Sequence, residues 1–503
     1  MTTSTLDATP RHHTLGRGAA SNAEPSHAPG STAFGQALRR ASSGDYFAWL
    51  EHVRPAAGCT RPIRLHGEIL TVDPATGQLL STVRTADLPD GQIYKPCGNR
   101  RHTVCPSCAH TYQGDAYQLI RTGLTGGKGI PESVATHPAV FVTLTAPSFG
   151  PVHTRRTTTS GKVLACRPRR EPDICPHGVD LRCHHTHADG EPALGTPLCP
   201  DCYHYHHQVV WNHHAPELWR RTRIALERHL RRTARTLGIP AQTVRLRYAK
   251  VAEMQRRGVV HFHAIIRLDG YDPTDPDAIL PPPAALTTDH LTEAVTAAAH
   301  ATLLVTDPHP ANPTGWPIAW GEQLDARSIR IGDGDLTDSM AAAYLAKYAT
   351  KATEATGHTS RRLTADIIDL YADPDGTHPE RLIDACWTLG EHWPTLRRWA
   401  HMLGFRGHFL TKARRWSITF QLLRDRRVIW RRTEGATTDP VEGEETTLIV
   451  ASLTYVGTGW HTLGDALLAN TAAALARERH AIAREELAHE QGLALSTPVP
   501  TAA

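Results

Sequence analysis

The chain contains no apolar run that could cross a membrane. None of its hydrophobic stretches approaches the roughly 18 residues at which a transmembrane helix becomes a candidate. The opening residues, MTTSTLDATPRHHTLGRG, also lack the apolar region of a secretory signal peptide. These two absences argue against an integral membrane protein and against an exported one. We therefore expect a cytoplasmic chain without a membrane partner.

Disulfides are not expected either, although the sequence contains ten cysteines. Thiols stay reduced in the cytoplasm, where clustered cysteines indicate metal sites more often than disulfides. Lysine is also scarce, so nearly all basic residues are arginine, whose planar guanidinium suits bidentate contact with phosphate. The formal net charge of +4 is small, so a basic surface would have to be local.

A phosphate-binding loop of the ATPase type is absent. The nearest candidate, TGLTGGKGI, has Thr122 where that loop begins with glycine, and Gly129 where a serine or threonine would bind magnesium. Nothing therefore supports an ATP-driven motor. The length of 503 residues and the hydrophobic content of 40% predict about two to four globular units with cores of their own.

Two C-x-x-C pairs are present, Cys105 with Cys108 and Cys199 with Cys202. This spacing lets two thiolates converge on one tetrahedral ion. Each pair has further cysteines upstream that would complete a set of four ligands. We therefore expect about two structural zinc ions. The expected ligands are Cys59, Cys97, Cys105 and Cys108 for one ion, and Cys175, Cys183, Cys199 and Cys202 for the other.

Alternatives stay open for both sets. Cys59 is the least secure ligand of the first set, and His66 or His102 could replace it. Unpaired thiols in a hydrophobic core are the structural alternative for either set. Cys166 and Cys386 are expected to be free. The histidines that compete for the second ion are His177, His184, His185 and His187.

The stretch RGVVHFHAIIRLDG, residues 257–270, alternates in the way that is typical of a β-strand. His261 and His263 share one face, on which Ile265 is the one apolar exception. Successive side chains of a strand point to opposite faces, so the two imidazoles project together and the other face is buried. The residues of that buried face are Val260, Phe262, Ala264, Ile266 and Leu268.

A preceding strand, VRLRYAKVAEMQ over residues 244–255, is separated from this one by Arg-Arg-Gly. A three-residue hairpin with Gly258 in the left-handed conformation fits this spacing. Glu253 then lies opposite His261 and on the same face. Two imidazoles and this carboxylate predict a divalent-metal site with open positions, which favours Mg²⁺ or Mn²⁺, although imidazole also accepts zinc. Gln255 is an alternative third ligand, and a purely structural histidine pair is the alternative to a metal.

Residues 337–354, TDSMAAAYLAKYATKATE, predict a helix that begins at Thr337 or Asp338. Tyr344 and Tyr348 are four residues apart and share one face, and Lys347 and Lys351 share the adjacent face. Paired tyrosines on an alanine-rich helix usually pack. A phenol, whose pKa is ordinarily about 10, becomes a nucleophile when a cation lies beside it and a metal polarises its target.

Together these motifs resemble the HUH endonucleases, and among them the rolling-circle replication initiators. FVTLTAPS (141–148) looks like their first motif, a strand ending in Thr-Leu-Thr, and VHFHAII looks like their metal-binding second motif. YLAKYATK (344–351) looks like the third, and is similar to the double-tyrosine motif of the gene A replication proteins of isometric single-stranded DNA phages. The position of Glu253 is similar to that of the glutamate ligand of geminivirus-type initiators.

From about Gly58 to Arg432 the chain resembles the replication initiators of actinobacterial plasmids and integrative conjugative elements. This resemblance implies an α+β fold in which helices pack on one face of an antiparallel HUH-type sheet, with zinc-ribbon insertions. The two tails lie outside the resemblance and are expected to be disordered, because residues 1 to about 40 are rich in Thr, Ser, Ala, Gly and Pro without periodicity and the last residues read the same way. The segments that carry it are CGNRRHTVCPSCAHTYQGDAYQLIRTGL, APSFGPVHTR, LCPDCYHYHHQVVWNHHAPELW and HMLGFRGHFLTKARRWS.

The resemblance also implies a DNA-nicking enzyme. By analogy, Glu253, His261 and His263 hold Mg²⁺ or Mn²⁺ against the scissile phosphate of a double-stranded origin. One tyrosine attacks, which leaves a 5′-phosphotyrosine and a free 3′-OH, and the other cleaves after one round of synthesis. Lys347 and Lys351 orient or activate the phenols, or hold phosphates. The implied partners are double-stranded and single-stranded origin DNA, and a host helicase and polymerase.

Two other functions stay open. A relaxase or transposase with an HUH core would use the same chemistry at a transfer origin or a transposon end. A non-catalytic, zinc-dependent DNA-binding regulator would not need the histidines, the glutamate or the tyrosines. A segment dense in arginine and aromatic residues, 397–433, favours contact with nucleic acid, and a helix with a solvated basic face is the structural alternative.

The expected organisation follows the order of these motifs along the chain. The nicking domain occupies the centre and carries the second four-cysteine set as an insertion over about residues 165–215. The expected segments are a disordered tail (1–45), a zinc module (46–135), the nicking domain (136–358), a basic helical DNA-binding segment (359–435) and a C-terminal strand and helix with a flexible tail (436–503).

Overall fold

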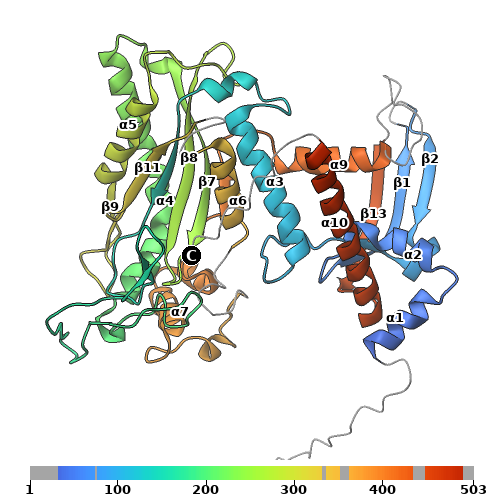
Figure 1. The fold of residues 1–503 in the computed structure, drawn as a ribbon, viewed down its shortest axis with the longest axis horizontal. Helices are drawn as coiled ribbons and strands as arrows, with labels where there is room; N and C mark the ends of the chain where they lie inside the picture. Colours follow the sequence, from blue (N-terminus) through green and yellow to red (C-terminus); the bar gives the residue numbers. More distant parts are fainter. Residues whose placement is uncertain (1–31, 74–75, 331–335, 352–361, 434–447, 491–503) are drawn as a thin grey trace, which may run out of the picture.

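The computed structural model describes residues 32–490 apart from residues 74–75, 331–335, 352–361 and 434–447. Two larger antiparallel sheets organise the fold, one with five strands and one with four. They lie side by side, with helix α3 (Pro106–Thr125) between them (Figure 1). None of the helices in these residues combines the length and the apolar character needed to span a membrane.

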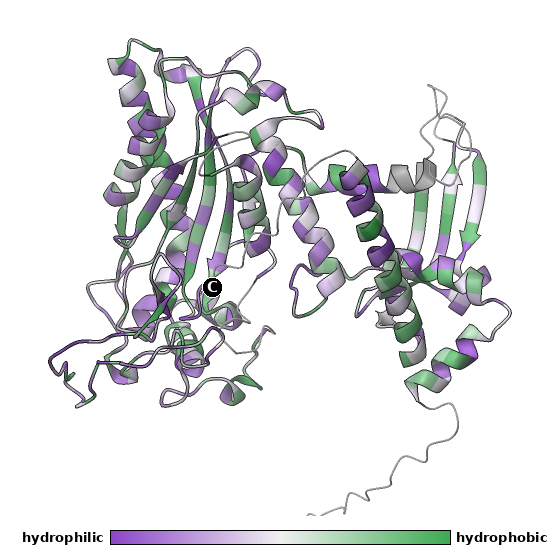
Figure 2. Cartoon of the chain, viewed as in Figure 1, coloured by the Kyte–Doolittle hydropathy of each residue, from purple (hydrophilic) through white to green (hydrophobic). Residues whose placement is uncertain are grey.

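The five-stranded sheet has the strand order β11-β4-β8-β7-β12. Hydrophobic and hydrophilic residues alternate along its central strands (Figure 2). One face packs against helices α4 (Tyr205–Thr236) and α5 (Thr288–Ala301), where Phe262 and Ile266 join a large core. The strands are β4 (Ala139–Leu144), β7 (Val244–Met254), β8 (Val260–Gly270), β11 (Leu324–Ser328) and β12 (Leu410–Lys412).

A second core covers the opposite face of the same sheet. Helices α3 and α6 (Asp338–Tyr348) pack there, and Ile265 contacts a cluster that includes Leu119 and Leu345. This packing explains why the apolar Ile265 stands on the otherwise polar face of β8: both faces of the strand are covered over part of its length. The expectation that helices cover only one face is therefore wrong.

The smaller sheet joins the two ends of the chain. Strand β13 (Leu448–Thr458) pairs antiparallel with β1 (Ile63–Val72) along the whole length of β1. The other two strands, β2 (Leu79–Arg84) and β3 (Ile93–Lys95), also pair with β1. The segments expected as a separate zinc module and a separate C-terminal region therefore share one sheet.

Three helices complete this terminal unit: α1 (Ala33–Ala41), α2 (Tyr46–Val53) and α10 (Leu463–Glu490). Helix α1 lies within the tail expected to be disordered. Two ion pairs of Arg40 hold α1 against the rest of the terminal unit: its guanidinium lies 2.6 Å from Asp90 and 2.9 Å from Asp465 of α10. The disorder predicted for residues 1–31 and 491–503 stays a prediction, because these positions lie outside the described residues.

The arginine-rich segment is not uniformly helical. It begins in α8 (Pro394–Arg398), supplies the edge strand β12 and ends in α9 (Phe420–Thr433). Phe405, Phe409 and Trp416 are buried in the two cores, so these aromatic rings stabilise the fold and are not free to stack on bases. Other short elements are α7 (His378–Leu389), β5 (Arg156–Thr157), β6 (Val163–Leu164), β9 (Leu303–Val305) and β10 (Pro317–Ala319).

Candidate metal centre and tyrosine pair

The β7–β8 hairpin has the register that the sequence predicts. Glu253 pairs with His261 across the two strands. The turn closes with a hydrogen bond from the Gln255 amide to the Val259 carbonyl, at 2.9 Å. Gly258 has a φ of +75°, the left-handed conformation that glycine adopts without strain. The predicted turn and the predicted pairing are both confirmed.

Replacing Gly258 by alanine should destabilise the domain by about 2–4 kcal/mol, because left-handed strain and overpacking add. An added Cβ would lie 2.7 Å from Leu403 Cδ1 and 2.8 Å from Leu382 Cδ1. Gly238 is the matched control, since its φ is +69° and nothing lies within 4 Å of its added Cβ. Gly238→Ala should cost only about 1 kcal/mol. Urea unfolding of both variants tests this, and equal losses would contradict it.

Three side chains converge on the polar face of this hairpin. Oε2 of Glu253 lies 2.8 Å from Nε2 of His261 and 3.2 Å from Nε2 of His263, and the two Nε2 atoms are 3.1 Å apart. The Nδ1 atoms turn away: that of His263 lies 3.1 Å from the Thr143 hydroxyl, and that of His261 lies 3.2 Å from the Gln255 amide nitrogen. The Thr143 hydroxyl can accept a hydrogen bond from Nδ1 of His263, a contact that leaves Nε2 of that ring free to bind a metal.

Gln255 does not join this cluster as a third donor. Its oxygen accepts a hydrogen bond from Nε of Arg257 at 2.9 Å. The Gln255 side-chain amide therefore bridges Arg257 in the hairpin turn and His261 on β8. The three donor atoms that lie within 4.8 Å of one another belong to Glu253, His261 and His263. Of the two third ligands left open by the sequence, the arrangement favours Glu253.

The electrostatics of the cluster favour the protonation states that a metal requires. Burial alone would raise the pKa of Glu253, but hydrogen bonds from His261 and His263 and the nearby charge of Lys351 lower it to about 2. Burial lowers the pKa of His263, of which only 2% is exposed. At neutral pH the carboxylate is therefore ionised and the His263 imidazole neutral, as ligands must be.

Helix α6 places both tyrosines over this cluster. The Thr337 side chain caps the helix by accepting a hydrogen bond from the Met340 amide. The Tyr344 ring lies 4.9 Å from the His263 ring and the Tyr348 ring 5.4 Å from it, measured between centroids. The two phenol rings are 4.5 Å apart. Burial raises the pKa of both phenols, so the tyrosines are neutral without a further activating group.

The two lysines differ in position. Nζ of Lys351 lies 3.4 Å from Oε1 of Glu253 and 4.4 Å from the centre of the Tyr348 ring. Nζ of Lys347 is exposed on the helix and lies 5.8 Å from the same ring. Lys351 is therefore part of the cluster, whereas Lys347 lies at its margin.

The first cysteine set assembles as expected. Sγ of Cys97 lies 3.7 Å from Sγ of Cys108, and Sγ of Cys105 lies 3.8 Å from Sγ of Cys59. Sulfurs on a tetrahedral zinc with bonds of about 2.3 Å are about 3.8 Å apart, so the set fits zinc. Neither alternative histidine belongs to this group of donors, which is formed by the four cysteines alone.

This cysteine set lies next to the end of the tyrosine helix. Arg100, three residues after Cys97, donates hydrogen bonds to the Ala349 carbonyl at 3.0 Å and to the Lys351 carbonyl at 2.8 Å. The same guanidinium stacks on Phe409. A metal in the cysteine set would thereby brace the segment that carries Tyr348 and Lys351.

The second cysteine set differs from the expectation in one ligand. Cys175, Cys199 and Cys202 come together with His177, whose Nδ1 lies 3.1 Å from Sγ of Cys202. A tight turn returns His177 to this group, because the Cys175 amide donates to the Val179 carbonyl at 2.9 Å. Cys183 instead lies 3.6 Å from Nε2 of His187, so its expected place in this set is wrong. The Cys-Pro-His spacing was the available signal for His177.

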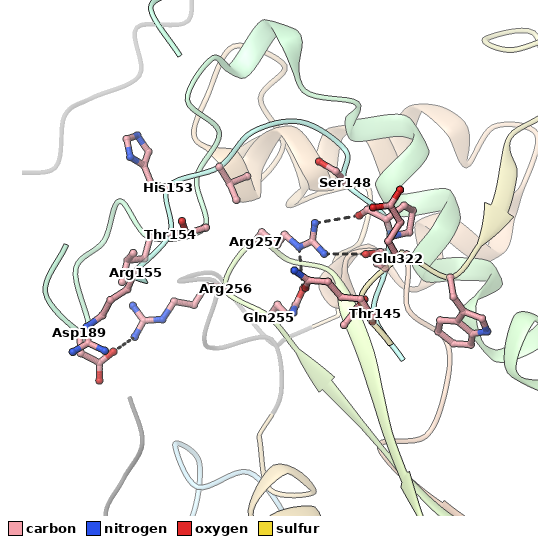
Figure 3. A pocket seen from close by; sticks show the side chains of 18 residues that line it. Thr145, Ser148, His153, Thr154, Arg155, Asp189, Gln255, Arg256, Arg257 and Glu322 are labelled. Carbon is pink, nitrogen blue, oxygen red and sulfur yellow. Dashed lines mark hydrogen bonds and ion pairs between the residues drawn. The ribbon is translucent and has the colours of Figure 1, made fainter. Parts of the chain in front are cut away.

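A cleft of about 810 Å³ opens beside the hairpin turn. Its walls include Thr145, Ser148, Gln255 and Arg257 on one side and His153 to Arg155 on the other (Figure 3). Arg257 donates to the Pro147 carbonyl at 3.2 Å, which ties the turn to the loop after β4. From the sequence, Arg256 and Arg257 were predicted only to form the hairpin turn. The sequence contains no local motif that would have predicted this cleft.

Comparison with known proteins connects this arrangement to DNA replication. A family model described as "Replication initiator protein, pSAM2" matches residues 45–474. A curated replication initiator protein from Streptomyces ambofaciens is 42% identical over 468 residues, which cover 90% of this chain and 95% of the relative. No solved structure matches. The family match spans both cysteine sets, the hairpin and the tyrosine helix, and the chain belongs to the pSAM2 family of replication initiator proteins.

Proposed function

We propose that this chain nicks one strand at the replication origin of a plasmid or integrative conjugative element by tyrosine attack, and thereby starts rolling-circle replication. Its family supports the initiator role. One observation supports the chemistry above all: His263 contacts Glu253 and His261 on one side and both tyrosine rings on the other. A candidate metal ligand and two candidate nucleophiles therefore meet at one residue, which is the arrangement that metal-assisted tyrosine attack requires.

A divalent ion suits this donor set. Glu253, His261 and His263 would hold it, and one carboxylate with two neutral imidazoles leaves open positions for phosphate oxygens. Mg²⁺ or Mn²⁺, when bound, supplies Lewis-acid polarisation of the scissile phosphate. The remaining contributions come from the side chains of the chain itself.

The nicking step conserves phosphodiester energy. Oη of Tyr344 or Tyr348 forms a bond to phosphorus, the P–O3′ bond breaks, and the phenol proton ends on the departing O3′. The products are a 5′-phosphotyrosine and a free 3′-OH that can prime synthesis. Lys351, which lies beside the Tyr348 ring, would stabilise the negative charge that develops on a phenol oxygen.

The second tyrosine gives the protein a second cut. With both phenols beside His263, the unused tyrosine could attack the phosphate that one round of synthesis regenerates. The 3′-OH released by that cut would then attack the first phosphotyrosine, which closes the displaced circle and frees the first tyrosine. Lys347, at the margin of the cluster, would contact flanking phosphates.

The proposal predicts a covalent protein–DNA adduct on supercoiled DNA that carries the element's own replication origin. The adduct should require added Mg²⁺ or Mn²⁺. Omission and re-addition of the ion are preferable to strong chelation, which would also remove metal from the cysteine sets. A scrambled origin serves as control and should give at least about tenfold less adduct, since base contacts separate specific from non-specific sites.

The alternatives predict other results in the same experiment. A relaxase would form the adduct at the transfer origin of the element and not at its replication origin. A non-catalytic regulator would bind origin DNA and form no adduct with either ion. Either result would contradict the proposed function.

A further inference from the structure

A group of donors that the sequence did not bring together lies in the insertion between β4 and α4. It consists of His153, Cys166, Cys183 and His187, whose donor atoms all lie within 4.8 Å of one another. Nδ1 of His153 lies 3.1 Å from Nε2 of His187, and Sγ of Cys183 lies 3.6 Å from the same Nε2. Cys166 was expected to be free, and Cys183 was expected in the neighbouring set.

These separations match the edges of a zinc tetrahedron. With bonds of about 2.0–2.1 Å to nitrogen and about 2.3 Å to sulfur, neighbouring ligand atoms lie roughly 3.3 Å apart for two nitrogens and roughly 3.6 Å apart for nitrogen and sulfur. We propose that His153, Cys166, Cys183 and His187 bind a zinc ion, additional to those predicted for the two cysteine-rich sets. Two thiolates and two imidazoles form a closed structural site of the Cys₂His₂ type.

Outer contacts orient these ligands. Nδ1 of His187 lies 2.8 Å from a carboxylate oxygen of Glu191, an arrangement that fixes the ring and presents the other nitrogen to a metal. The Thr154 amide donates to Sγ of Cys166 at 3.2 Å, which stabilises a thiolate. The competing group formed by His185, His187 and Glu191 lacks sulfur, and its His185 is exposed, so the Cys₂His₂ set is the better zinc site.

The two metal sites of the insertion alternate along the chain. The ligand pairs follow one another as His153 and Cys166, then Cys175 and His177, then Cys183 and His187, and finally Cys199 and Cys202. The first and third pairs form the proposed site, and the second and fourth pairs form the neighbouring one. Each ion would therefore close a loop that contains ligands of the other, so that neither site is independent.

The insertion has little else to stabilise it. Across residues 151–201, all of which the structure describes, the buried side chains outside the two donor groups are Leu194 and Pro197. Regular structure in this stretch is limited to the short strands β5 and β6, isolated bridges and the beginning of a short 3-10 helix, Pro200–Cys202. A segment with so small a core folds when metal binding supplies the free energy.

The proposed ion would also hold one wall of the cleft in place. Val152, His153 and Thr154 line that wall, and Gly195 packs so tightly that an added Cβ would meet the Arg256 backbone at 2.6 Å. Asp189 reaches across to Arg256 at 3.1 Å. The insertion thereby rests on the turn of the β7–β8 hairpin (Figure 3), the same hairpin that carries Glu253, His261 and His263.

Elemental analysis and thiol mapping of the full chain test this proposal. We expect three zinc ions per chain in total, and Cys166→Ser or His187→Ala should each remove at least one of them. His184→Ala is the matched control, because His184 is exposed and belongs to none of the donor groups. It should leave the zinc content unchanged. Full zinc content in both ligand variants would overturn the proposal.

Alkylation of the unmodified protein gives a second readout that does not depend on a variant folding. Cys166 and Cys183 should be protected from N-ethylmaleimide in the native protein and become reactive when a chelator removes zinc. Cys386, buried in the main core, should stay protected throughout, which separates metal loss from global unfolding. Reactive Cys166 and Cys183 in zinc-loaded protein would overturn the proposal even if both variants fail to fold.

Discussion

Replacing Tyr344 and Tyr348 together by phenylalanine is expected to abolish the covalent adduct with origin DNA. The loss should be at least about 10³-fold, because a missing nucleophile leaves only binding and electrostatic contributions. Phenylalanine keeps both rings, and so keeps the ring contacts with His263. Only the two hydroxyl oxygens are lost. Denaturing gels of labelled origin DNA measure the adduct.

Controls separate the loss of a nucleophile from the loss of structure. Tyr112→Phe is matched, because the Tyr112 ring stacks on Phe420 and not on His263, and this variant should nick normally. Binding of Mn²⁺ to the double variant should be unchanged, since neither phenol belongs to the donor group. The single variants should each retain one cut and lose the paired reaction. Adduct formation by the double variant would refute the nucleophile assignment.

Asp269→Asn is expected to cost about 3–5 kcal/mol of folding free energy, because it leaves buried positive charge uncompensated. Asp269 and Arg267 are both fully buried, with two nitrogen–oxygen distances of 2.7 Å. Arg247 approaches the same carboxylate at 3.6 Å, and His137 lies 2.8 Å from it. The melting temperature should fall by roughly 6–20 °C for a domain of this size.

An exposed aspartate gives the matched control for this variant. Asp277 pairs with Arg415 at the surface and is 47% exposed at its side chain, so Asp277→Asn should cost less than about 1 kcal/mol. Urea unfolding followed by tryptophan fluorescence reports on both variants, since Trp416 stacks on Arg267. Equal stability of the two variants would contradict the role given to the buried pair.

The contribution of Asp269 to the free energy of unfolding is expected to decrease at acidic pH. Burial alone would raise the pKa of Asp269, but hydrogen bonds from His137 and Arg267 lower it below its usual value. A carboxyl whose pKa is lowered by folding stabilises the protein above its unfolded pKa of about 3.9 and loses that contribution as the pH falls through the folded value. The difference between wild type and Asp269→Asn should therefore stay constant from about pH 5 to 8 and shrink only below about pH 4.

The local part of the candidate site could be predicted from the sequence because its determinants are local. A period of two residues fixes which face carries His261 and His263, and a three-residue turn with Gly258 fixes Glu253 opposite His261. The C-x-x-C spacing likewise placed Cys105 with Cys108. Each of these relations spans few residues, so chain geometry leaves little freedom.

The errors concern relations that depend on tertiary structure. Spacing alone could not choose between His177 and Cys183, because the choice depends on how distant segments of the insertion meet. An isolated β-bridge with Arg167 holds Cys183 outside the second set. The second core under Ile265 requires helices from distant segments. Whether the arginine-rich segment touches DNA stays a prediction. Arg424 and Arg426 are exposed on α9, whereas Phe405, Phe409 and Trp416 are buried in the two cores.

The pairing of β13 with β1 has a consequence for how the protein is made. The ribosome delivers Ile63–Val72 early, but their partner, Leu448–Thr458, emerges only near the end of translation. Domains that are complete earlier fold earlier, so the five-stranded sheet can form while β1 still has an open edge. An open edge is a template for aggregation. A chain released before residue 448 would therefore carry Tyr344 and Tyr348 together with a terminal sheet that lacks β13.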